Sequence, residues 1–93
     1  MREKTRLMES QEFIRTAMSE AMGIYLEKEK SPKYADTWRD MDIYGLTSHL
    51  AHEVEEIRAH SPTLAAIYHN ALDAINLSAM IAAKARLESL ELK

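Results

Sequence analysis

The chain contains no cysteine, which excludes disulfide scaffolds, thiolate zinc sites and cysteine nucleophiles. It has only two glycines and two prolines, too few for a β-sandwich or barrel with a turn about every 8–12 residues. The longest unbroken apolar run, residues 79–83, is far shorter than the roughly 20 residues that span a bilayer. No basic segment followed by an apolar stretch marks an export signal. We therefore expect a soluble cytoplasmic protein with no membrane partner.

Basic residues are outnumbered by acidic ones. Twelve Lys and Arg stand against fifteen Asp and Glu, which gives a net charge of −3. A nucleic-acid-binding surface needs the opposite balance, so we expect no nucleic-acid partner. The chain has 93 residues, of which 46% are hydrophobic and 29% charged. This composition predicts one folded domain over residues 1–93, whose isolated monomer would be only marginally stable.

Apolar residues recur at helical spacing in three segments. The first predicted helix covers residues 9–28, and Gly23 weakens it by about 1 kcal/mol relative to alanine. Residues 29–42 break the period and predict an ordered loop, because the rings of Tyr34 and Trp38 are costly to leave in water. The predicted apolar face of the first helix consists of Ile14, Ala17, Met18, Ala21 and Tyr25.

Two further helices are predicted after the loop. Asp42 is a suitable N-cap for the second helix, which should end near His60. Ser61 is expected to cap the third helix, with Pro62 at its first position, and this helix should run to about Leu90. The predicted core stripe of the second helix is Ile43, Leu46, Leu50, Val54 and Ile57.

The third helix is apolar on two faces. A helix that is apolar nearly all round should be buried on more than one side, which three helices of a small chain can hardly achieve. We therefore predict an all-α fold with three main helices per chain, in which a homodimer or homotetramer completes a four-helix-bundle core. One face carries Tyr68, Ala71, Leu72, Ile75, Ala79 and Ala82, and the other carries Ile67, Ala74, Leu77 and Ile81.

A polar stripe borders the core face of the second helix. On the third helix, Asp73 stands inside an apolar run, and an unpaired buried charge costs several kcal/mol. Its partner could be Arg58, a lysine, or a metal ion held jointly with Glu53 and Glu56. Oxygen ligands on facing helices suit Mg²⁺ or Mn²⁺. The stripe on the second helix consists of His49, His52, Glu53, Glu56 and His60.

These residues also have simpler interpretations. Acidic residues on a helix commonly form a solvated face, and histidines commonly lie at surfaces or caps. A single tryptophan such as Trp38 commonly fills a core rather than stacking on a ligand. Spacing alone leaves these alternatives open.

Two acidic motifs stand in a characteristic order. Residues 52–56 read HEVEE and residues 70–73 read NALD. Together they resemble the Glu-Glu-x-x-Glu and Glu-x-x-Asp pair of the MazG-like, all-α nucleoside triphosphate pyrophosphohydrolases. The WRD at 38–40 is similar to the lead-in of short members of this family, and the run at 73–82 is similar to the segment that begins at their aspartate. The resemblance covers about residues 10–86.

The resemblance implies a function and a set of site residues. Members of the family use Mg²⁺ to release pyrophosphate and a nucleoside monophosphate by attack of water on a nucleotide phosphate. A nucleoside triphosphate is therefore the implied partner, and Mg²⁺ or Mn²⁺ the implied cofactor. The matching positions are Glu53, Glu56 and Asp73 for metal binding and catalysis, and Lys33, Trp38 and Asn76 for nucleotide binding.

Two positions depart from the family pattern. His52 replaces the first glutamate, and Asn70 replaces the glutamate of Glu-x-x-Asp. Both remain candidate metal ligands, but imidazole suits Mn²⁺, Fe²⁺ or Zn²⁺ better than Mg²⁺, and an amide offers only a neutral oxygen. The first hypothesis is therefore a pyrophosphohydrolase that is weakened by these replacements. The alternatives are a catalytically inactive helical oligomer that binds a nucleotide or a protein, and a bare oligomerisation module.

Overall fold

The computed structural model describes residues 2–60 and 62–91. Over these residues it is helical and contains no strand, which confirms the all-α prediction with three main helices. A 3₁₀ turn and a π-helical turn accompany the main helices. The elements in chain order are α1 (Arg2–Glu29), η1 (Thr37–Asp40), α2 (Ile43–Glu55), η2 (Glu56–His60) and α3 (Leu64–Glu91).

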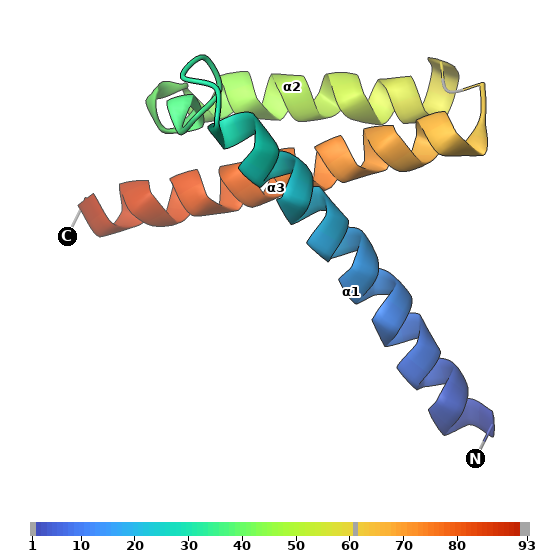
Figure 1. The fold of residues 1–93 in the computed structure, drawn as a ribbon. Helices are drawn as coiled ribbons and strands as arrows, with labels where there is room; N and C mark the ends of the chain where they lie inside the picture. The colour runs from blue at the N-terminus through green and yellow to red at the C-terminus, as the bar shows by residue number, and fades with distance from the viewer. Residues whose placement is uncertain (1, 61, 92–93) are drawn as a thin grey trace.

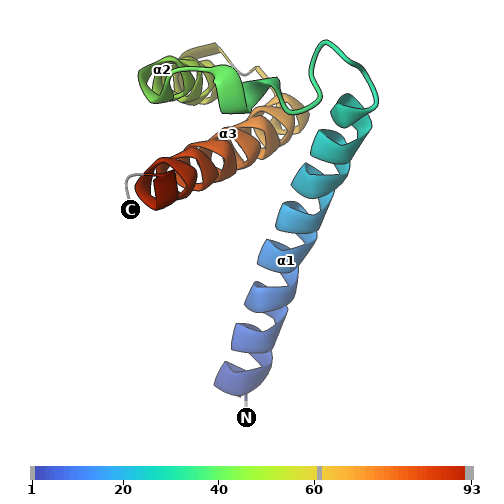
Figure 2. The ribbon, with the colours of Figure 1, turned by 90° about the vertical axis from the view of Figure 1, so that its left-hand side faces the viewer.

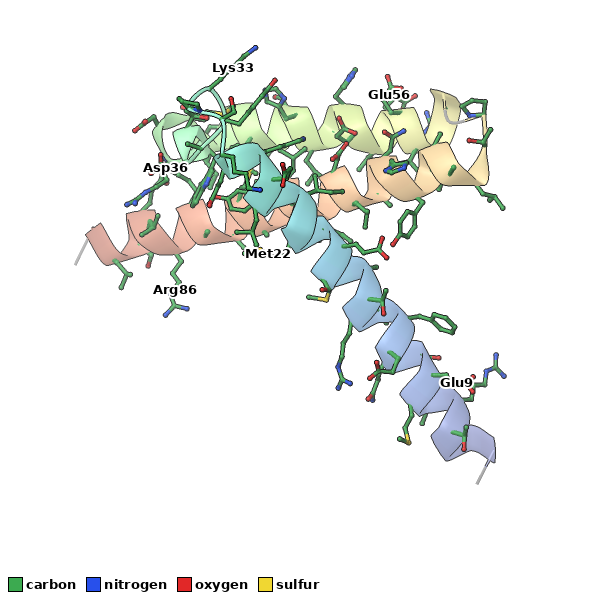
Figure 3. All side chains as sticks on the ribbon, in the orientation of Figure 1. Glu9, Met22, Lys33, Asp36, Glu56 and Arg86 are labelled. Atoms are coloured by element: carbon green, nitrogen blue, oxygen red, sulfur yellow. The ribbon has the colours of Figure 1, made fainter. Side chains whose placement is uncertain are left out.

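Helices α2 and α3 lie side by side and antiparallel, and α1 crosses α3 near its middle (Figures 1 and 2). The first half of α1 extends away from this pair, and the side chains drawn on it project into open space (Figure 3). The molecule is consequently elongated, with extents of 48 × 36 × 25 Å.

The fully buried core is small. Among the described residues it consists of Ala21, Leu46 and Leu72, one from each main helix. Asn76 on α3 adds a polar tie, because its side-chain Nδ2 donates a hydrogen bond to the backbone oxygen of Ala21 at 2.9 Å. A second hydrogen bond between α3 and α1 lies eight residues before Asn76 on α3. There the hydroxyl of Tyr68 donates to the carboxylate of Glu20.

Helix α3 contacts both α1 and α2 within one chain. Its second apolar face is half-buried, but on its first face Tyr68, Ala79 and Ala82 stay exposed. The two neighbours from the same chain thus cover the two faces only in part. Further uncovered apolar surface lies on α1. Ile14 and Met18, both predicted to face the core, are 61% and 57% exposed. They precede the crossing point, where no other helix of the chain reaches them.

The core stripe of α2 is rotated relative to the prediction. Leu46 is buried, and Ile43, Leu50 and Ile57 are half-buried, but Val54 is 49% exposed. Glu53, which was expected to border the core face, is half-buried. The inward face of α2 is therefore turned slightly toward Glu53 and away from Val54.

The helix ends test the capping predictions. The carboxylate of Asp42 accepts a hydrogen bond from the Tyr44 backbone N–H at 2.7 Å, which confirms Asp42 as the N-cap of α2. Helix α3 starts at Leu64 rather than Pro62, and the Thr63 hydroxyl accepts from the Ala66 backbone N–H at 3.1 Å. The predicted cap Ser61 lies outside the described residues. The α-helical part of α2 ends at Glu55, and the chain continues to His60 as a π-helical turn.

No helix in the described ranges combines the length and the apolar character needed to cross a membrane.

Candidate functional site

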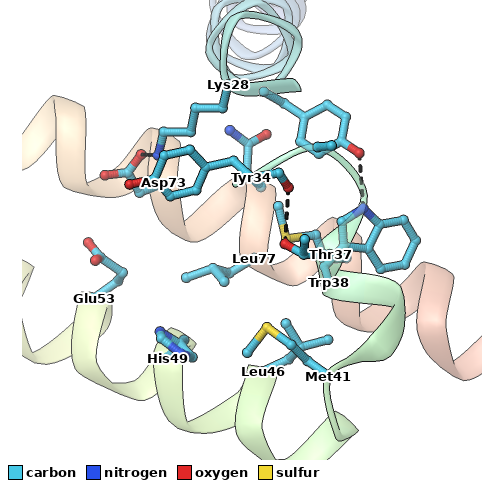
Figure 4. Close-up of a pocket in the computed structure, with 14 residues that line it drawn as sticks. Lys28, Tyr34, Thr37, Trp38, Met41, Leu46, His49, Glu53, Asp73 and Leu77 are labelled. Carbon is cyan, nitrogen blue, oxygen red and sulfur yellow. Dashed lines mark hydrogen bonds and ion pairs between the residues drawn. The ribbon is translucent and has the colours of Figure 1, made fainter. Parts of the chain in front are cut away.

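A pocket of about 270 Å³ opens between the end of α1, the loop after it, α2 and α3 (Figure 4). Its size is close to the lower end of the roughly 300–1,000 Å³ typical of ligand sites. All three main helices and the loop contribute to its wall. The lining residues are Tyr25 and Lys28 from α1; Tyr34, Ala35, Thr37, Trp38 and Met41 from the loop; Leu46, His49 and Glu53 from α2; and Asp73, Asn76, Leu77 and Met80 from α3.

Loop residues form an aromatic wall at one end of the pocket. Trp38 is half-buried, and its indole Nε1 donates a hydrogen bond to the Tyr25 hydroxyl at 2.9 Å. The Thr37 hydroxyl donates to the Tyr34 backbone oxygen at 3.1 Å, which fixes the turn that leads into η1. Burial raises the pKa of Tyr25, although the bond from Trp38 partly opposes this shift. The predicted ordered loop therefore exists, and the hydrogen bond from the Trp38 indole to the Tyr25 hydroxyl joins it to α1.

The opposite end of the pocket is charged. Glu53 from α2 and Asp73 from α3 line the same cavity, with His49 one turn before Glu53 (Figure 4). The Lys28 ammonium lies 3.9 Å from an oxygen of Asp73. This pair is partly exposed and at the limit of ion-pair distance, so it contributes at most about 1 kcal/mol. Of the partners considered for Asp73 from the sequence, the structure supplies a lysine.

Arg58, the other side chain considered for Asp73, faces elsewhere. Its guanidinium bonds to the Glu55 carboxylate at 3.2 Å, one turn earlier in the chain. Both side chains are exposed, and neither lines the pocket.

Several predicted site residues lie outside the pocket lining. His52 Nε2 is 3.6 Å from a Glu56 oxygen, and His52 is exposed. Lys33 projects from the loop into solvent, with its ammonium 5.4 Å from the centre of the Tyr34 ring (Figure 3). Asn70 does not contribute to the wall either. The structure thus brings together Trp38, Asn76, Glu53 and Asp73, and leaves the other predicted residues elsewhere.

The acidic side chains do not form a dense cluster. Across residues 2–60 and 62–91, no group of three or more His, Asp or Glu side chains is arranged so that it could hold a metal ion. The pocket offers two carboxylates on facing helices. Mg²⁺ is commonly bound by one or two carboxylates together with the phosphates of a substrate. Glu53 and Asp73 are thus the two carboxylates of the pocket that could take part in holding such an ion.

Sequence reasoning did not assign Lys28 or His49 to the site. Lys28 looked like an ordinary charge near the end of the first helix, and only the crossing of α1 over α3 places it beside Asp73. His49 belonged to the recognised polar stripe, but it was not assigned to the site. Its spacing of four residues from Glu53 was the available signal, because i and i+4 residues share a helix face.

Comparison with protein-family models, with curated proteins and with solved structures finds no match to the chain.

Proposed function

We propose that this pocket binds a nucleoside triphosphate and hydrolyses it, with a divalent metal ion, to a nucleoside monophosphate and pyrophosphate. The observation that carries the proposal is that the two ends of the pocket differ in chemistry. Trp38 and its neighbours give an aromatic and apolar end for a base, and Glu53 and Asp73 give an acidic end. The resemblance of the acidic motifs to the MazG-like pyrophosphohydrolases supports the same assignment.

The chemistry assigns a role to each polar group. A bond forms between water oxygen and a phosphorus, and the phosphoanhydride between the α- and β-phosphates breaks. We assign Glu53 to accept the proton of the attacking water, since it is half-buried and lines the cavity. A bound Mg²⁺ or Mn²⁺ would neutralise phosphate charge. Asp73 would hold it together with phosphate oxygens, and Lys28 would turn from Asp73 toward a phosphate.

A second candidate function rests on the sparse acidic set. A non-catalytic protein could bind a nucleotide in the same pocket, because two carboxylates form a weaker metal site than the four or five acidic positions of the family pattern. In this case Trp38 and the apolar end would still hold a base. The two functions differ in turnover and share the binding site.

A panel of nucleoside triphosphates, each with Mg²⁺ or Mn²⁺, distinguishes them by assay of pyrophosphate and monophosphate. For the enzyme, Glu53→Gln should lower the rate by about 100-fold or more, as expected for loss of a general base. Glu55→Gln is the matched control, because Glu55 is paired with Arg58 outside the pocket. Nucleotide binding without metal-dependent product would select the non-catalytic function.

We also propose that the protein is a homo-oligomer, a dimer or a tetramer, that completes a helical bundle. The small buried core supports this proposal, since only Ala21, Leu46 and Leu72 are fully buried in the part of the chain described. Sedimentation at micromolar concentration should give a mass of at least twice 10.7 kDa. A stable monomer would contradict it. A cytoplasmic location likewise remains a prediction of the sequence.

A further inference from the structure

An apolar stripe on α1 is left largely uncovered by the rest of the chain. Its members are 48–63% exposed, although all are large apolar side chains. At 100° per residue their spacing places them within about 120° of one another, over a length of about 28 Å. This α1 stripe consists of Leu7, Ile14, Met18, Met22 and Leu26.

The whole chain exposes more surface than a compact protein of its mass. Its accessible surface is 7524 Å², whereas a compact monomer of 10.7 kDa should expose roughly 5,500 Å². Its radius of gyration is 15.7 Å, against about 12 Å for a compact domain of this length. The excess of about 2,000 Å² lies within the roughly 1,000–2,500 Å² that each subunit buries in an obligate homodimer. A second copy of the chain is therefore an occupant of the right size.

A groove beside the α1 stripe is a candidate binding site for a helix. It is lined by Met22 on α1 and by the small residues Ala79 and Ala83 on α3, and its volume is about 190 Å³. Small side chains let a second helix approach closely. The groove also touches Trp38 and Met80, which line the ligand pocket on their other side. An occupant of the groove would thus support the wall of the pocket from behind.

We propose that two copies of the chain pair through this stripe, with their α1 helices antiparallel and the two-fold axis beside Met18. In a two-fold symmetric contact, the same surface patch of both copies forms the interface. If residue i of one copy contacts residue j of the other, then residue j of the first copy contacts residue i of the second. With Met18 on the axis, Ile14 of one copy meets Met22 of the other. The projecting first half of each α1 then lies in the groove of the other copy, against Ala79 and Ala83.

The proposed pairing has a consequence for the pocket. The helix of the second copy shields the rear of Trp38 and Met80 from water, so each pocket depends on the other chain. This consequence rests on the proposed nucleotide-binding function, whereas the pairing itself does not.

Single cysteines test the pairing directly, because the natural chain has none. Under mild oxidation, Met18→Cys should form a disulfide-linked dimer rapidly at low micromolar concentration, with its helical circular dichroism intact. Phe13→Cys is the control, since Phe13 is 76% exposed and lies on a different side of α1. It should cross-link at least tenfold more slowly. Equal rates for the two variants, or no cross-link through position 18, would overturn the proposed axis.

Charge substitution gives an independent readout. Met18→Glu with Met22→Glu should place like charges together across the axis and raise the dimer dissociation constant at least 100-fold in sedimentation, whereas Phe13→Glu should not.

Loss of the dimer together with at least tenfold weaker binding of a nucleoside triphosphate would support the role in the pocket wall. A wild-type dimer that cross-links at position 18 and binds no nucleotide would support the pairing and contradict the proposed function. A wild-type monomer at tens of micromolar would overturn the pairing.

Discussion

At the scale of single residues, the contact between Trp38 and Tyr25 decides the form of the pocket wall. Tyr25→Phe removes the acceptor of the indole N–H, whose hydrogen bond spans 2.9 Å. The free energy of unfolding should fall by about 1 kcal/mol, the usual net value of one hydrogen bond. The emission of Trp38, the only tryptophan, should shift as well. Tyr44→Phe is the matched control, since Tyr44 is 78% exposed. Equal stability of the two variants in urea would contradict the role of the bond.

Two tyrosines also make stability depend on pH. Burial raises the pKa of Tyr25, and the hydrogen bond to Glu20 raises the pKa of Tyr68, both from the model-compound value of 10.0. The folded state therefore holds these protons to a higher pH than the unfolded state does. Their contribution is fully present below pH 10 and is lost as the pH rises through and beyond 10. Melting temperature against pH should show this decline, and Tyr25→Phe with Tyr68→Phe should flatten it.

Residues differed in how well they could be predicted from sequence. Asp42 was assigned correctly because an N-cap depends only on neighbouring backbone groups. The need of Asp73 for a partner was also foreseen, but the identity of Lys28 depends on how α1 crosses α3. Glu56 was grouped with Glu53 by spacing alone, and the structure gives it His52 as a neighbour outside the pocket lining. Local chemistry was thus predictable, whereas pairing between helices was not.

At the scale of helices, α1 carries an avoidable weakness. Gly23 lies in the interior of the helix without a positive φ, and a methyl group added there would meet nothing within 4 Å. Gly23→Ala should therefore raise the free energy of unfolding by about 0.5–1 kcal/mol, because alanine restricts the unfolded chain more than glycine does.

Urea denaturation checks this gain, and Gly45→Ala provides a comparison. Gly45 lies in the first turn of α2, and its added methyl would stand 4.0 Å from the Met41 side chain, which lines the pocket. The substitution at Gly45 should gain less, since the first turn profits less from helix propensity. A loss of stability in Gly23→Ala would mean that this side of α1 is covered in solution.

The helices themselves were predicted more accurately than their faces. Periodicity identified three helices in the correct order, because each segment repeats its apolar residues at helical spacing. It placed Val54 in the core, where the structure leaves it 49% exposed, but its placement of Glu53 beside the core face agrees with the half-buried position of that side chain. An apolar stripe on a helix fixes its orientation only to within a residue or so. The projection of the first half of α1 was not predicted. The apolar periodicity of one segment does not indicate which part of that segment a neighbouring helix covers.

At the scale of the whole molecule, charge governs how the pocket can accept a triphosphate. The chain carries a net charge of −3, and two carboxylates line the pocket. A free triphosphate should be repelled by this charge. A free divalent ion should bind weakly, since only two carboxylates face it and Lys28 already accompanies Asp73. Binding of the two together removes both obstacles, because the metal ion neutralises phosphate charge while phosphate oxygens complete its ligand set.

The proposed site therefore predicts strong coupling between metal and nucleotide in the stability of the protein. Mg²⁺ alone, or a nucleoside triphosphate in EDTA, should leave the melting temperature nearly unchanged. Both together at ten times the dissociation constant should stabilise by about 1.4 kcal/mol, or roughly 6–11 °C. Asp73→Asn should abolish the coupling and Glu55→Gln should retain it. If the nucleotide stabilises equally in EDTA, the carboxylates do not hold a metal with it, and the pocket binds without the proposed chemistry.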